Sequence, residues 1–284
     1  MHIKYNPITK VILYPIIAMG EWLGLHYPKL YMEIRYLARF GRPINLKNPR
    51  NLNEKILWYY FNTDTTSWTE LSDKLKVRQY VREKGCGEML KKVYAEWREV
   101  GDVDFKSLPN SFVLKCNNGS GTVEIVKDKS LLDEETVLKK MRQWMEKTDY
   151  GYEYHYRKIK NRLFAEEYLP IGDTSSSIVD YKFWCFNGKP YYVWVCSERR
   201  GTVTDTMIYD MNWTACPQYV KQTSSYRLAS IMEKPQCFDD MASIAKVLSH
   251  GFPVVRVDLF ESNGRPYFGE MTFTSVGGMN NMYS

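Results

Sequence analysis

The spacing of apolar residues is helical in the first part of the chain. Residues 1 to about 70 are predicted to form helices joined by loops. A further helix is expected from Leu71 to about Lys84, because Ser72 and Asp73 are residues that cap helix N-termini. Helices are also expected over residues 132–147 and 238–250, where apolar residues recur every three or four positions.

The spacing becomes that of β-strands from about residue 90. Apolar runs at 111–116 and 122–127 flank a glycine-rich turn and predict a β-hairpin. A second hairpin is predicted at 180–187 and 190–196, because Asn187-Gly188 is a strong signal for a two-residue turn. The remaining expected strands are 162–169, 254–260 and 265–271. This order of elements predicts an α+β fold of two lobes, each an antiparallel sheet with helices.

The chain is predicted to divide into a helical, substrate-side segment (1–70), a first lobe (71–165) and a second lobe (166–284). The first segment contains an apolar run at 11–25, which Pro15, Gly20 and Glu21 interrupt. This run is shorter than the roughly 20 residues that cross a bilayer, and no small-residue cleavage site of a signal peptide follows it. We expect a core or interfacial helix there, with peripheral contact to a membrane as the alternative.

Composition narrows the classes of function. With 44% hydrophobic and 25% charged residues, the chain has the make-up of a folded soluble protein. Its net charge of +6 suits anionic partners, but the basic residues are dispersed, so nucleic-acid binding is not expected. Six cysteines without a CxxC pair and only four histidines disfavour a zinc site and favour a reducing cytoplasm. No histidine lies near a GxSxG-like turn, so Ser/His or Cys/His hydrolysis has little support.

Two acidic residues near the C-terminus give the strongest chemical signal. Arg256 and Asp258 share one face of their strand, and Glu270 and Thr272 share one face of the next. A hairpin brings Asp258 and Glu270 side by side, where two carboxylates repel unless a cation lies between them. Because Mg²⁺ prefers such oxygen ligands, together with water and phosphate, we predict a magnesium site. The alternative is a surface hairpin with solvent-facing acids, which the apolar flanking residues disfavour.

A lysine followed by a glycine-rich turn gives the second signal. Lys115 lies in the apolar run 112–116, directly before Asn117-Asn118-Gly119-Ser120-Gly121. An unpartnered ammonium in an apolar strand is unfavourable, and the backbone N–H groups of such a turn can surround an anion. We therefore predict a phosphate site; the alternative is a plain hairpin with an edge lysine. The pattern is not a Walker motif, because the lysine precedes the glycines.

Three weaker patterns each have an ordinary structural alternative. Glu166 and Glu167 lie in the apolar run 165–169 and suit either an adenine or ribose contact or a salt-bridged strand. Asp180 and Lys182 share a strand face, which suits a phosphate or ribose contact or a simple ion pair. Arg199 ends a strand, where it can clamp an anion or belong to a solvated charge cluster.

Taken together, these motifs resemble the TupA-like ATP-grasp family, which is associated with teichuronopeptide and other surface-polysaccharide synthesis. The resemblance covers roughly residues 45 to 275 in order. The matching stretches are Asn53-Glu54-Lys55-Ile56 with Trp58, Ser72-Asp73-Lys74 with Val77-Arg78, Leu108-Pro109, Phe112 to Gly121, Glu166-Glu167, Asp180 to Gly188, Arg256 to Leu259 and Phe268 to Thr272. The chain ends at Ser284, soon after Gly277-Gly278, which is earlier than this resemblance leads us to expect.

The resemblance implies an ATP-grasp fold in which ATP lies between two antiparallel sheets. The nucleotide-binding residues that it implies are Lys74 and Lys115 on phosphates, the turn Gly119-Ser120-Gly121 over them, the adenine hinge Glu166, Glu167, Tyr168 and Leu169, and Asp180. Asp258 and Glu270 are then the ligands of magnesium, of which two ions are expected, with Thr272 at a position where many ATP-grasp enzymes carry Asn. The implied catalytic residues are Arg256, Arg199 and Lys182.

The function that follows from the resemblance is an ATP- and magnesium-dependent carboxylate–amine ligase that forms an acyl phosphate. We expect it to join an amino acid or amino sugar to a carboxylate on a glycan precursor, in the cytoplasm or at the inner face of the membrane. The alternatives are a kinase of the same fold, a glycosyltransferase, and a non-catalytic carbohydrate-binding protein, which the 15% aromatic content favours.

Overall fold

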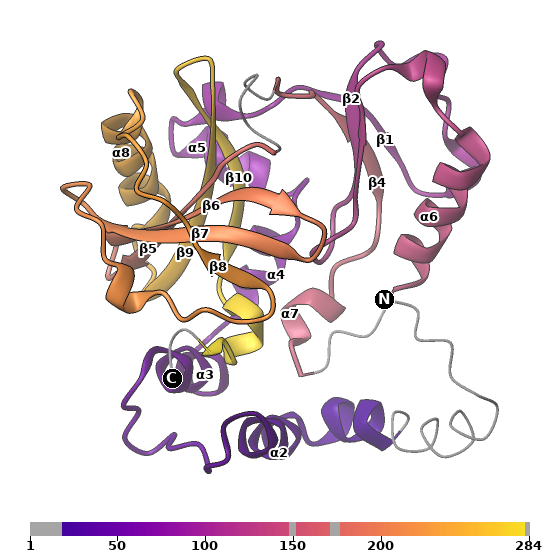
Figure 1. Ribbon diagram of the computed structural model, residues 1–284. Helices are drawn as coiled ribbons and strands as arrows, with labels where there is room; N and C mark the ends of the chain where they lie inside the picture. The colour runs from indigo at the N-terminus through magenta and orange to yellow at the C-terminus, as the bar shows by residue number, and fades with distance from the viewer. Residues whose placement is uncertain (1–18, 148–151, 171–176, 282–284) are drawn as a thin grey trace.

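The computed structural model describes residues 19–147, 152–170 and 177–281 of the chain. Two β-sheets lie on either side of a cleft, with helices on the faces that point away from it (Figure 1). Strands β1 to β4 form the smaller sheet and β5 to β10 the larger one. This is the α+β architecture of two sheet-and-helix lobes that the element order predicts.

The larger sheet has six strands in the order β10-β9-β5-β6-β7-β8. Its neighbours are antiparallel except for the parallel pair β7 and β8. Helix α8 (Phe238–Ser249) packs on β5, β6 and β9. The strands are β5 (Asp180–Phe186), β6 (Lys189–Arg200), β7 (Val203–Asp210), β8 (Tyr226–Leu228), β9 (Val254–Ser262) and β10 (Arg265–Thr272).

The smaller sheet has four antiparallel strands in the order β1-β4-β2-β3. They are β1 (Val93–Trp97), β2 (Phe112–Cys116), β3 (Val123–Val126) and β4 (Leu163–Glu166). Helix α6 (Glu134–Glu146) packs on β2, and its N-cap Asp133 accepts a hydrogen bond from the Thr136 backbone N–H at 3.1 Å. Val137 and Met141 place the apolar face of α6 in the core of this lobe.

Helices from the N-terminal part of the chain lie beneath the two sheets (Figure 1). They are a helix whose described part is 19–26, α2 (Pro28–Phe40) and α3 (Leu52–Asn62). Helix α4 (Thr66–Ser72) contacts β10, α5 (Val77–Glu83) and α7 (Tyr154–Arg157). Short 3-10 turns are η1 (Gly87–Met89), η2 (Val100–Asp102), η3 (Lys129–Leu131), η4 (Pro217–Tyr219) and η5 (Ser275–Gly278). Helix α3 contacts η5, so a helix of the N-terminal part packs against the C-terminal part of the chain.

The prediction of one helix over 71–84 is wrong. Helix α4 ends at Ser72, and α5 begins only at Val77. The Asp73 carboxylate accepts hydrogen bonds from the backbone N–H groups of Leu75 and Lys76, so it stabilises a turn between the two helices. The predicted strand 162–169 is too long, because β4 ends at Glu166. Strands β1, β7 and β8 were not predicted.

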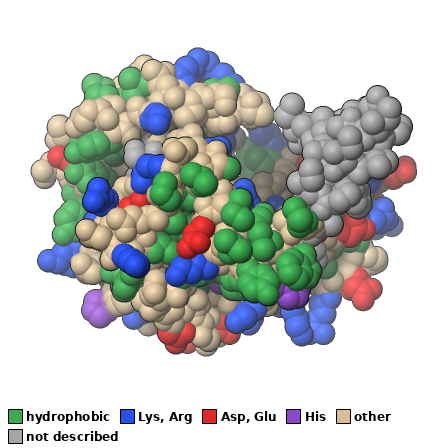
Figure 2. All heavy atoms as spheres, turned by 90° about the horizontal axis from the view of Figure 1, so that it is seen from below, with side chains coloured by type: hydrophobic (Ala, Val, Ile, Leu, Met, Phe, Trp, Pro, Cys, Tyr) green, Lys and Arg blue, Asp and Glu red, His purple; other side chains and the backbone are tan. Residues whose placement is uncertain are grey.

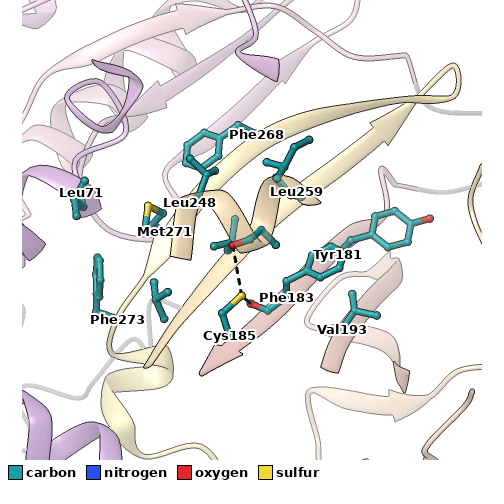
Figure 3. Packing of buried hydrophobic residues seen from close by; sticks show 14 of the residues in the cluster. Leu71, Tyr181, Phe183, Cys185, Val193, Leu248, Leu259, Phe268, Met271 and Phe273 are labelled. Carbon is teal, nitrogen blue, oxygen red and sulfur yellow. Dashed lines mark hydrogen bonds between the residues drawn. The ribbon is translucent and has the colours of Figure 1, made fainter. Parts of the chain in front are cut away.

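The larger sheet is apolar on one face and charged on the other. Tyr181, Phe183 and Cys185 of β5 point into the core beneath α8, together with Leu259 of β9 (Figure 3). The intervening residues of these strands line the cleft: Asp180, Lys182, Arg256 and Asp258. The alternation of a β-strand therefore places the candidate site directly on the back of a packed core.

A β-bulge in β10 sets which residues face the cleft. Plain alternation would put Phe268 and Glu270 on the same face of the sheet. The register shifts between Phe268 and Glu270, so Phe268 packs in the core while Glu270 and Thr272 line the cleft. Gly269 permits the bulge, because a Cβ there would lie 2.8 Å from the Asp258 carbonyl oxygen and 2.9 Å from the Phe260 ring.

Candidate active site

A cavity of about 1130 Å³ lies between the two sheets and reaches helix α2. Residues of both sheets line it, so the topology brings together groups that are far apart in the sequence. The predicted site residues that line it are Lys74, Lys115, Gly119, Ser120, Gly121, Asp180, Lys182, Arg199, Arg256, Asp258, Glu270 and Thr272.

Asp258 and Glu270 are direct neighbours in the ladder between β9 and β10, which is the arrangement that the hairpin pattern predicts. Arg256 reaches Asp258 through two hydrogen bonds, from Nε to Oδ1 at 2.6 Å and from Nη2 to Oδ2 at 2.7 Å. The Lys182 ammonium lies 2.6 Å from Asp258 Oδ2. Burial alone would raise the pKa of Asp258, but the charges of Arg256 and Lys182 outweigh it and lower the pKa, so the carboxylate is ionised.

Glu270 is bound more loosely than Asp258. Arg256 Nη2 lies 3.4 Å from Glu270 Oε1, and Lys74 Nζ lies 3.6 Å from Oε2. The Thr272 hydroxyl donates to Glu270 Oε1 at 3.1 Å. About a third of the Glu270 side chain, 32%, is exposed, against 2% for Asp258. Glu270 therefore keeps coordination capacity that Asp258 uses on its two cations.

The donor set fits a magnesium ion. Within the described ranges, no group of three or more His, Cys, Asp or Glu residues could hold a metal by itself. Mg²⁺, however, is commonly held by one or two carboxylates together with waters and substrate phosphates. Glu270 and Asp258 supply two adjacent carboxylates, and Thr272 adds a hydroxyl. They are the residues that would hold the ion.

Lys74 links the smaller sheet to this cluster. Its ammonium donates to the Gly119 carbonyl oxygen at 2.5 Å, on the glycine turn, and also faces Glu270. The neighbouring Asp73 is buried, and its carboxylate accepts a hydrogen bond from Asn117 Nδ2 at 2.9 Å, which fixes the backbone from which the Lys74 side chain extends. The Lys74 backbone N–H donates to the Asn117 carbonyl at 3.0 Å. The stretch 72–74 thus positions the ammonium beside the turn.

The glycine turn is held at its base and open at its tip. Asn118 Nδ2 donates to the Tyr156 carbonyl and to Asn161 Oδ1, at 3.1 and 3.0 Å. Gly119 and Gly121 have φ values of 71° and 76°, in the left-handed region that favours glycine. Since Gly119, Ser120 and Gly121 all line the cavity, the turn presents backbone to its interior.

One carboxylate in the smaller sheet is shared by two lysines. Glu166 Oε1 lies 2.6 Å from Lys115 Nζ and 2.9 Å from Lys91 Nζ. Burial would raise the pKa of Glu166, but the charges of Lys91 and Lys115 lower it to about 2. Burial lowers the pKa of Lys91 to about 8, although the negative charge of Glu166 acts to raise it. Near neutral pH the cluster carries one surplus positive charge, beside the glycine turn.

The predicted adenine hinge does not line the cavity, although Glu166 contacts Lys115, which does. None of Glu166, Glu167, Tyr168 and Leu169 lines the cavity. The Glu167 backbone N–H donates to the Lys92 carbonyl at 2.8 Å, and its carboxylate accepts from the Lys92 N–H at 3.1 Å. The hinge role therefore stays a prediction, and Glu166 has a visible role as the counter-ion of two lysines.

Asp180 continues the charge cluster along β5. Its carboxylate pairs with the Arg199 guanidinium and lies 3.4 Å from the Lys182 ammonium. Lys182 therefore lies between Asp180 and Asp258. Asp180, Lys182 and Arg199 therefore form ion pairs in this structure, as one of the two interpretations predicts. All three line the cavity, where a phosphate or ribose can compete for them.

Several charged groups at the site were not among the predicted residues, and Lys91 and Glu153 are two of them. Lys91 gave no signal because it lies between strand-like runs, and only the fold brings it to Glu166. Glu153 lies in the tyrosine-rich stretch 152–156, which has no recognisable motif, yet it lines the cavity at the end nearest α2. Burial raises its pKa to about 7.

The stretch 53–54, one of those on which the family resemblance rests, has a structural role. Asn53 exchanges two hydrogen bonds with the backbone of Asn280, at 2.8 and 3.0 Å, and so ties α3 to the C-terminal part of the chain. The buried Glu54 carboxylate accepts from Arg42 and from the backbone N–H of Arg50, both at 2.8 Å. Neither lies in the cavity between the sheets.

Comparison with protein families gives one match. The model of a family described as TupA-like ATPgrasp matches residues 54–284. Among curated protein sequences, none matches this chain significantly.

Several solved structures resemble the fold at low identity. D-alanine–D-alanine ligase from Bacillus anthracis, complexed with ATP, has a TM-score of 0.44 and 17% identity over 74% of this chain and 57% of its own. The ATP-grasp ligase PsnB with its minimal precursor has a TM-score of 0.41 and 11% identity, over 78% and 60%. N5-carboxyaminoimidazole synthase from Aspergillus clavatus has a TM-score of 0.43 and 10% identity, over 78% and 50%. The chain thus spans less than two thirds of each.

Proposed function

This chain belongs to the TupA-like ATP-grasp family, and from that premise we propose that it is an ATP- and magnesium-dependent ligase that joins a carboxylate to an amine. The family match covers residues 54–284 and confirms the resemblance and the ATP-grasp fold. The ligase reaction and its substrates are the proposal. It is supported by the site, in which phosphate-binding and metal-binding chemistry face the same cavity.

The observation that carries the proposal is the position of Lys74. Its ammonium lies between the Gly119 carbonyl of the glycine turn and the Glu270 carboxylate of the opposite sheet. A triphosphate along this line would have lysines and backbone N–H groups on one side and the metal carboxylates on the other. Lys115 adds the surplus charge that it shares with Lys91. Such an arrangement suits the transfer of a γ-phosphoryl group, which depends on positioning and charge stabilisation.

We assign the following roles to the residues of the site. Lys74, Lys115 and the turn hold the phosphates, while Arg256, Lys182 and Arg199 stabilise the negative charge on the phosphoryl group as it moves to the substrate carboxylate. Magnesium held by Glu270 and Asp258 would neutralise phosphate oxygens. The resulting acyl phosphate is attacked by the amine, which forms an amide and releases inorganic phosphate. Excluding water between the sheets protects the acyl phosphate from hydrolysis.

The first test is the substitution Glu270→Gln, which keeps the shape of the side chain and removes the charge. We expect formation of ADP from Mg-ATP to fall to background, because one of two carboxylates for the ion is lost. The matched control is Glu233→Gln, an exposed glutamate of the same lobe, which should turn over at the wild-type rate. Normal turnover by the Glu270 variant would refute the metal role.

The same assay separates the ligase from its rivals. A ligase releases ADP and free phosphate only when an acid and an amine are both present. A kinase of the same fold needs one acceptor and leaves the phosphate on it. A glycosyltransferase needs a nucleotide sugar and does not consume ATP, and a carbohydrate-binding protein gives no heat of binding with Mg-ATP.

The acid substrate is proposed to be a carboxylate on a surface-glycan precursor, which follows from the resemblance to a family of polysaccharide synthesis. The size of the cavity, about 1130 Å³, accommodates more than the nucleotide. Uronic acids and short uronate-containing oligosaccharides are the probes. ADP formation with simple amino acids as both acid and amine, and none with uronates, would contradict this choice.

The underside of the molecule supports the proposed membrane contact. Five apolar residues of the helix at 19–26 and of α2 are 47–53% exposed, and those within each helix are three or four positions apart: Trp22, Leu25, Leu30, Ile34 and Leu37. Figure 2, which views this underside, shows hydrophobic side chains gathered among Lys and Arg. Lys29, Arg42, Lys47 and Arg50 line a groove beside α2, with Glu33 and Glu54 as its acids. Apolar residues with a basic surround are the composition of a surface that binds anionic lipids.

We therefore propose that this face rests on an anionic membrane at the cytoplasmic side. No helix in the described ranges is long and apolar enough to cross a bilayer. Sedimentation with phosphatidylglycerol vesicles should bind the full chain, and the double substitution Leu30→Ser with Ile34→Ser should reduce binding strongly. Leu131→Ser is the control, because this leucine is 83% exposed elsewhere. Failure to bind these vesicles, or a dimer that the double substitution dissolves, would overturn the proposal.

A further inference from the structure

The end of the cavity nearest α2 contains charged groups that nucleotide binding does not use. Glu153 lies just before α7, and Arg35 and Arg39 lie one helical turn apart on α2; all three line the cavity. Tyr156 lines the same cavity, and its pKa is raised chiefly by burial and further by the charges of Glu153 and Glu270. The group of Glu153, Arg35 and Arg39 is called the α2 end below.

Glu153 is anchored but not neutralised. The Thr274 hydroxyl donates a hydrogen bond to its Oε1, and Thr274 also contacts His155 Nε2 at 3.3 Å. Oε2 borders Gly277, where a Cβ would lie 3.6 Å from it. No ion pair within the described residues includes Glu153. The carboxyl group is therefore held in one place, at the cavity wall, with one oxygen available.

The two arginines have spare charge. Arg35 donates to the Tyr31 hydroxyl at 3.3 Å and forms no ion pair with a described carboxylate. Arg39 has neither a hydrogen bond nor an ion pair with its side chain in the described ranges. The charge of Arg35 acts on Glu153, since it lowers the pKa that burial raises. A carboxyl and two guanidinium groups at one wall are complementary to a molecule that carries an ammonium and a carboxylate.

We propose that the α2 end binds the amine substrate and that this substrate is an amino acid, with its ammonium on Glu153 and its carboxylate on Arg39 and Arg35. This assignment rests on the proposed ligase function and narrows its amine partner from amino acids and amino sugars to amino acids. Glu153 is also assigned as the base. It accepts a proton from the ammonium and becomes a neutral carboxylic acid, which leaves an uncharged amine. The amine nitrogen then forms a bond with the acyl carbon, the bond from that carbon to the phosphate oxygen breaks, and the second proton leaves with the phosphate.

The neighbours of Glu153 make it the group that titrates near neutral pH at this end. Burial lowers the pKa of His155 to about 3, so the imidazole is neutral. Burial likewise raises the pKa values of Tyr60, Tyr152 and Tyr156 above the ordinary range. The pKa of Glu153, raised to about 7, therefore decides the charge that meets the ammonium.

The test is calorimetric binding to the full chain loaded with magnesium and a non-hydrolysable ATP analogue. The probes are the free L-amino acids, D-alanine and D-glutamate, each with its methyl ester and its N-acetyl derivative, and glucosamine. At least one free amino acid should bind, while its ester, which lacks the carboxylate, and its N-acetyl form, which lacks the ammonium, bind about 10–100-fold more weakly. Arg39→Gln should weaken binding by a similar factor, and Arg142→Gln, an exposed arginine on α6, should not.

The pH dependence gives a second readout. Ammonium binding needs ionised Glu153, so amino-acid affinity should rise as the pH increases through about 7 and then level off. In Glu153→Gln this rise should disappear while affinity for the ATP analogue stays the same. A purely structural role of Glu153 would lower the melting temperature and leave the pH profile unchanged.

The outcomes separate this inference from the ligase proposal. If the ATP analogue does not bind in the presence of magnesium, the ligase function itself fails. If it binds, but no amino acid does, or the methyl esters bind as well as the free acids, or glucosamine binds in their place, the amino-acid assignment is overturned. Amino-acid binding that Arg39→Gln leaves unchanged would overturn the role of the α2 end.

Discussion

The cleft has charged clusters on both walls, and they differ in how their charge is balanced. On the smaller sheet, one carboxylate, Glu166, serves two lysines, so positive charge is in surplus. On the larger sheet, Asp258 is saturated by Arg256 and Lys182. The first cluster is ready for an anion before any ligand arrives. For magnesium to bind as proposed, the second cluster would have to exchange a cation of the protein for the ion, which makes the open Glu270 the expected first ligand and Asp258 the second.

The proposed phosphate site and the proposed metal site are therefore prepared for their ligands in opposite ways. Two lysines that share one glutamate are not fully neutralised, so a triphosphate that binds beside them would lower the electrostatic free energy. Two carboxylates side by side are instead kept compatible by an arginine between them, since Arg256 contacts both. In the proposed mechanism, Arg256 would then be available to contact the phosphoryl group.

The largest effect is expected from Asp258→Asn. It leaves Arg256 and Lys182 buried without their principal partner, so the free energy of unfolding should fall by about 3–5 kcal/mol, and turnover of Mg-ATP should be lost. Urea unfolding measures the first and ADP formation the second. Asp239→Asn removes an exposed partner of Lys234 and should change stability by less than about 1 kcal/mol. Equal effects of the two substitutions would show that the inner pairing contributes nothing.

Glu166→Gln should have the second-largest effect on the free energy of unfolding, and this effect should depend on pH. Because the folded-state pKa of Glu166 is lowered to about 2, its contribution is complete above its unfolded value of 4.5 and is lost as the pH falls from 4.5 toward 2. That contribution is about 3 kcal/mol. Unfolding measured from pH 7 down to pH 3 should show a steep loss for the wild type and a shallower one for the variant. Parallel curves would mean that the two lysines do not hold this carboxylate.

Gly269→Ala is expected to have an intermediate effect on stability, and it should disturb the charged cluster of the larger sheet around Asp258 and Glu270 but not that of the smaller sheet. The added methyl group meets the Asp258 backbone and the Phe260 ring, so the bulge must relax and the free energy of unfolding should fall by about 1–3 kcal/mol. The turn of Glu270 toward the cleft would be disturbed, and ADP formation should fall with it. Gly101→Ala, where a Cβ meets no atom within 4 Å, is the control. A variant at position 269 that keeps stability and turnover would contradict the role of the bulge.

This bulge also marks the limit of prediction from the sequence. Period-two alternation and the hairpin signal were sufficient to place Asp258 beside Glu270 and to predict two α+β lobes, which the structure and the family match confirm. Alternation could not place Phe268, because a register shift of one residue depends on contacts across the sheet. Lys91 and Glu153 were missed for a related reason: their partners lie 75 and 121 residues away, at Glu166 and Thr274. The prediction of one helix at 71–84 was wrong because the Asp73 carboxylate accepts hydrogen bonds from the backbone of a turn and from the Asn117 side chain.

The smallest effect on stability is expected from Lys91→Met, which tests the surplus charge itself. Burial lowers the pKa of Lys91 to about 8, so its ammonium is held at an energetic cost that methionine of similar volume does not have. Glu166 keeps Lys115, so the free energy of unfolding should change by less than about 1.5 kcal/mol. The affinity for Mg-ATP should fall, and by less than in Lys115→Met, whose side chain lines the cavity and for which a loss of about 10–100-fold is expected. Titration calorimetry of both variants ranks them. If Lys91→Met binds Mg-ATP as tightly as the wild type, the phosphate site depends on Lys115 alone and the second lysine serves only Glu166.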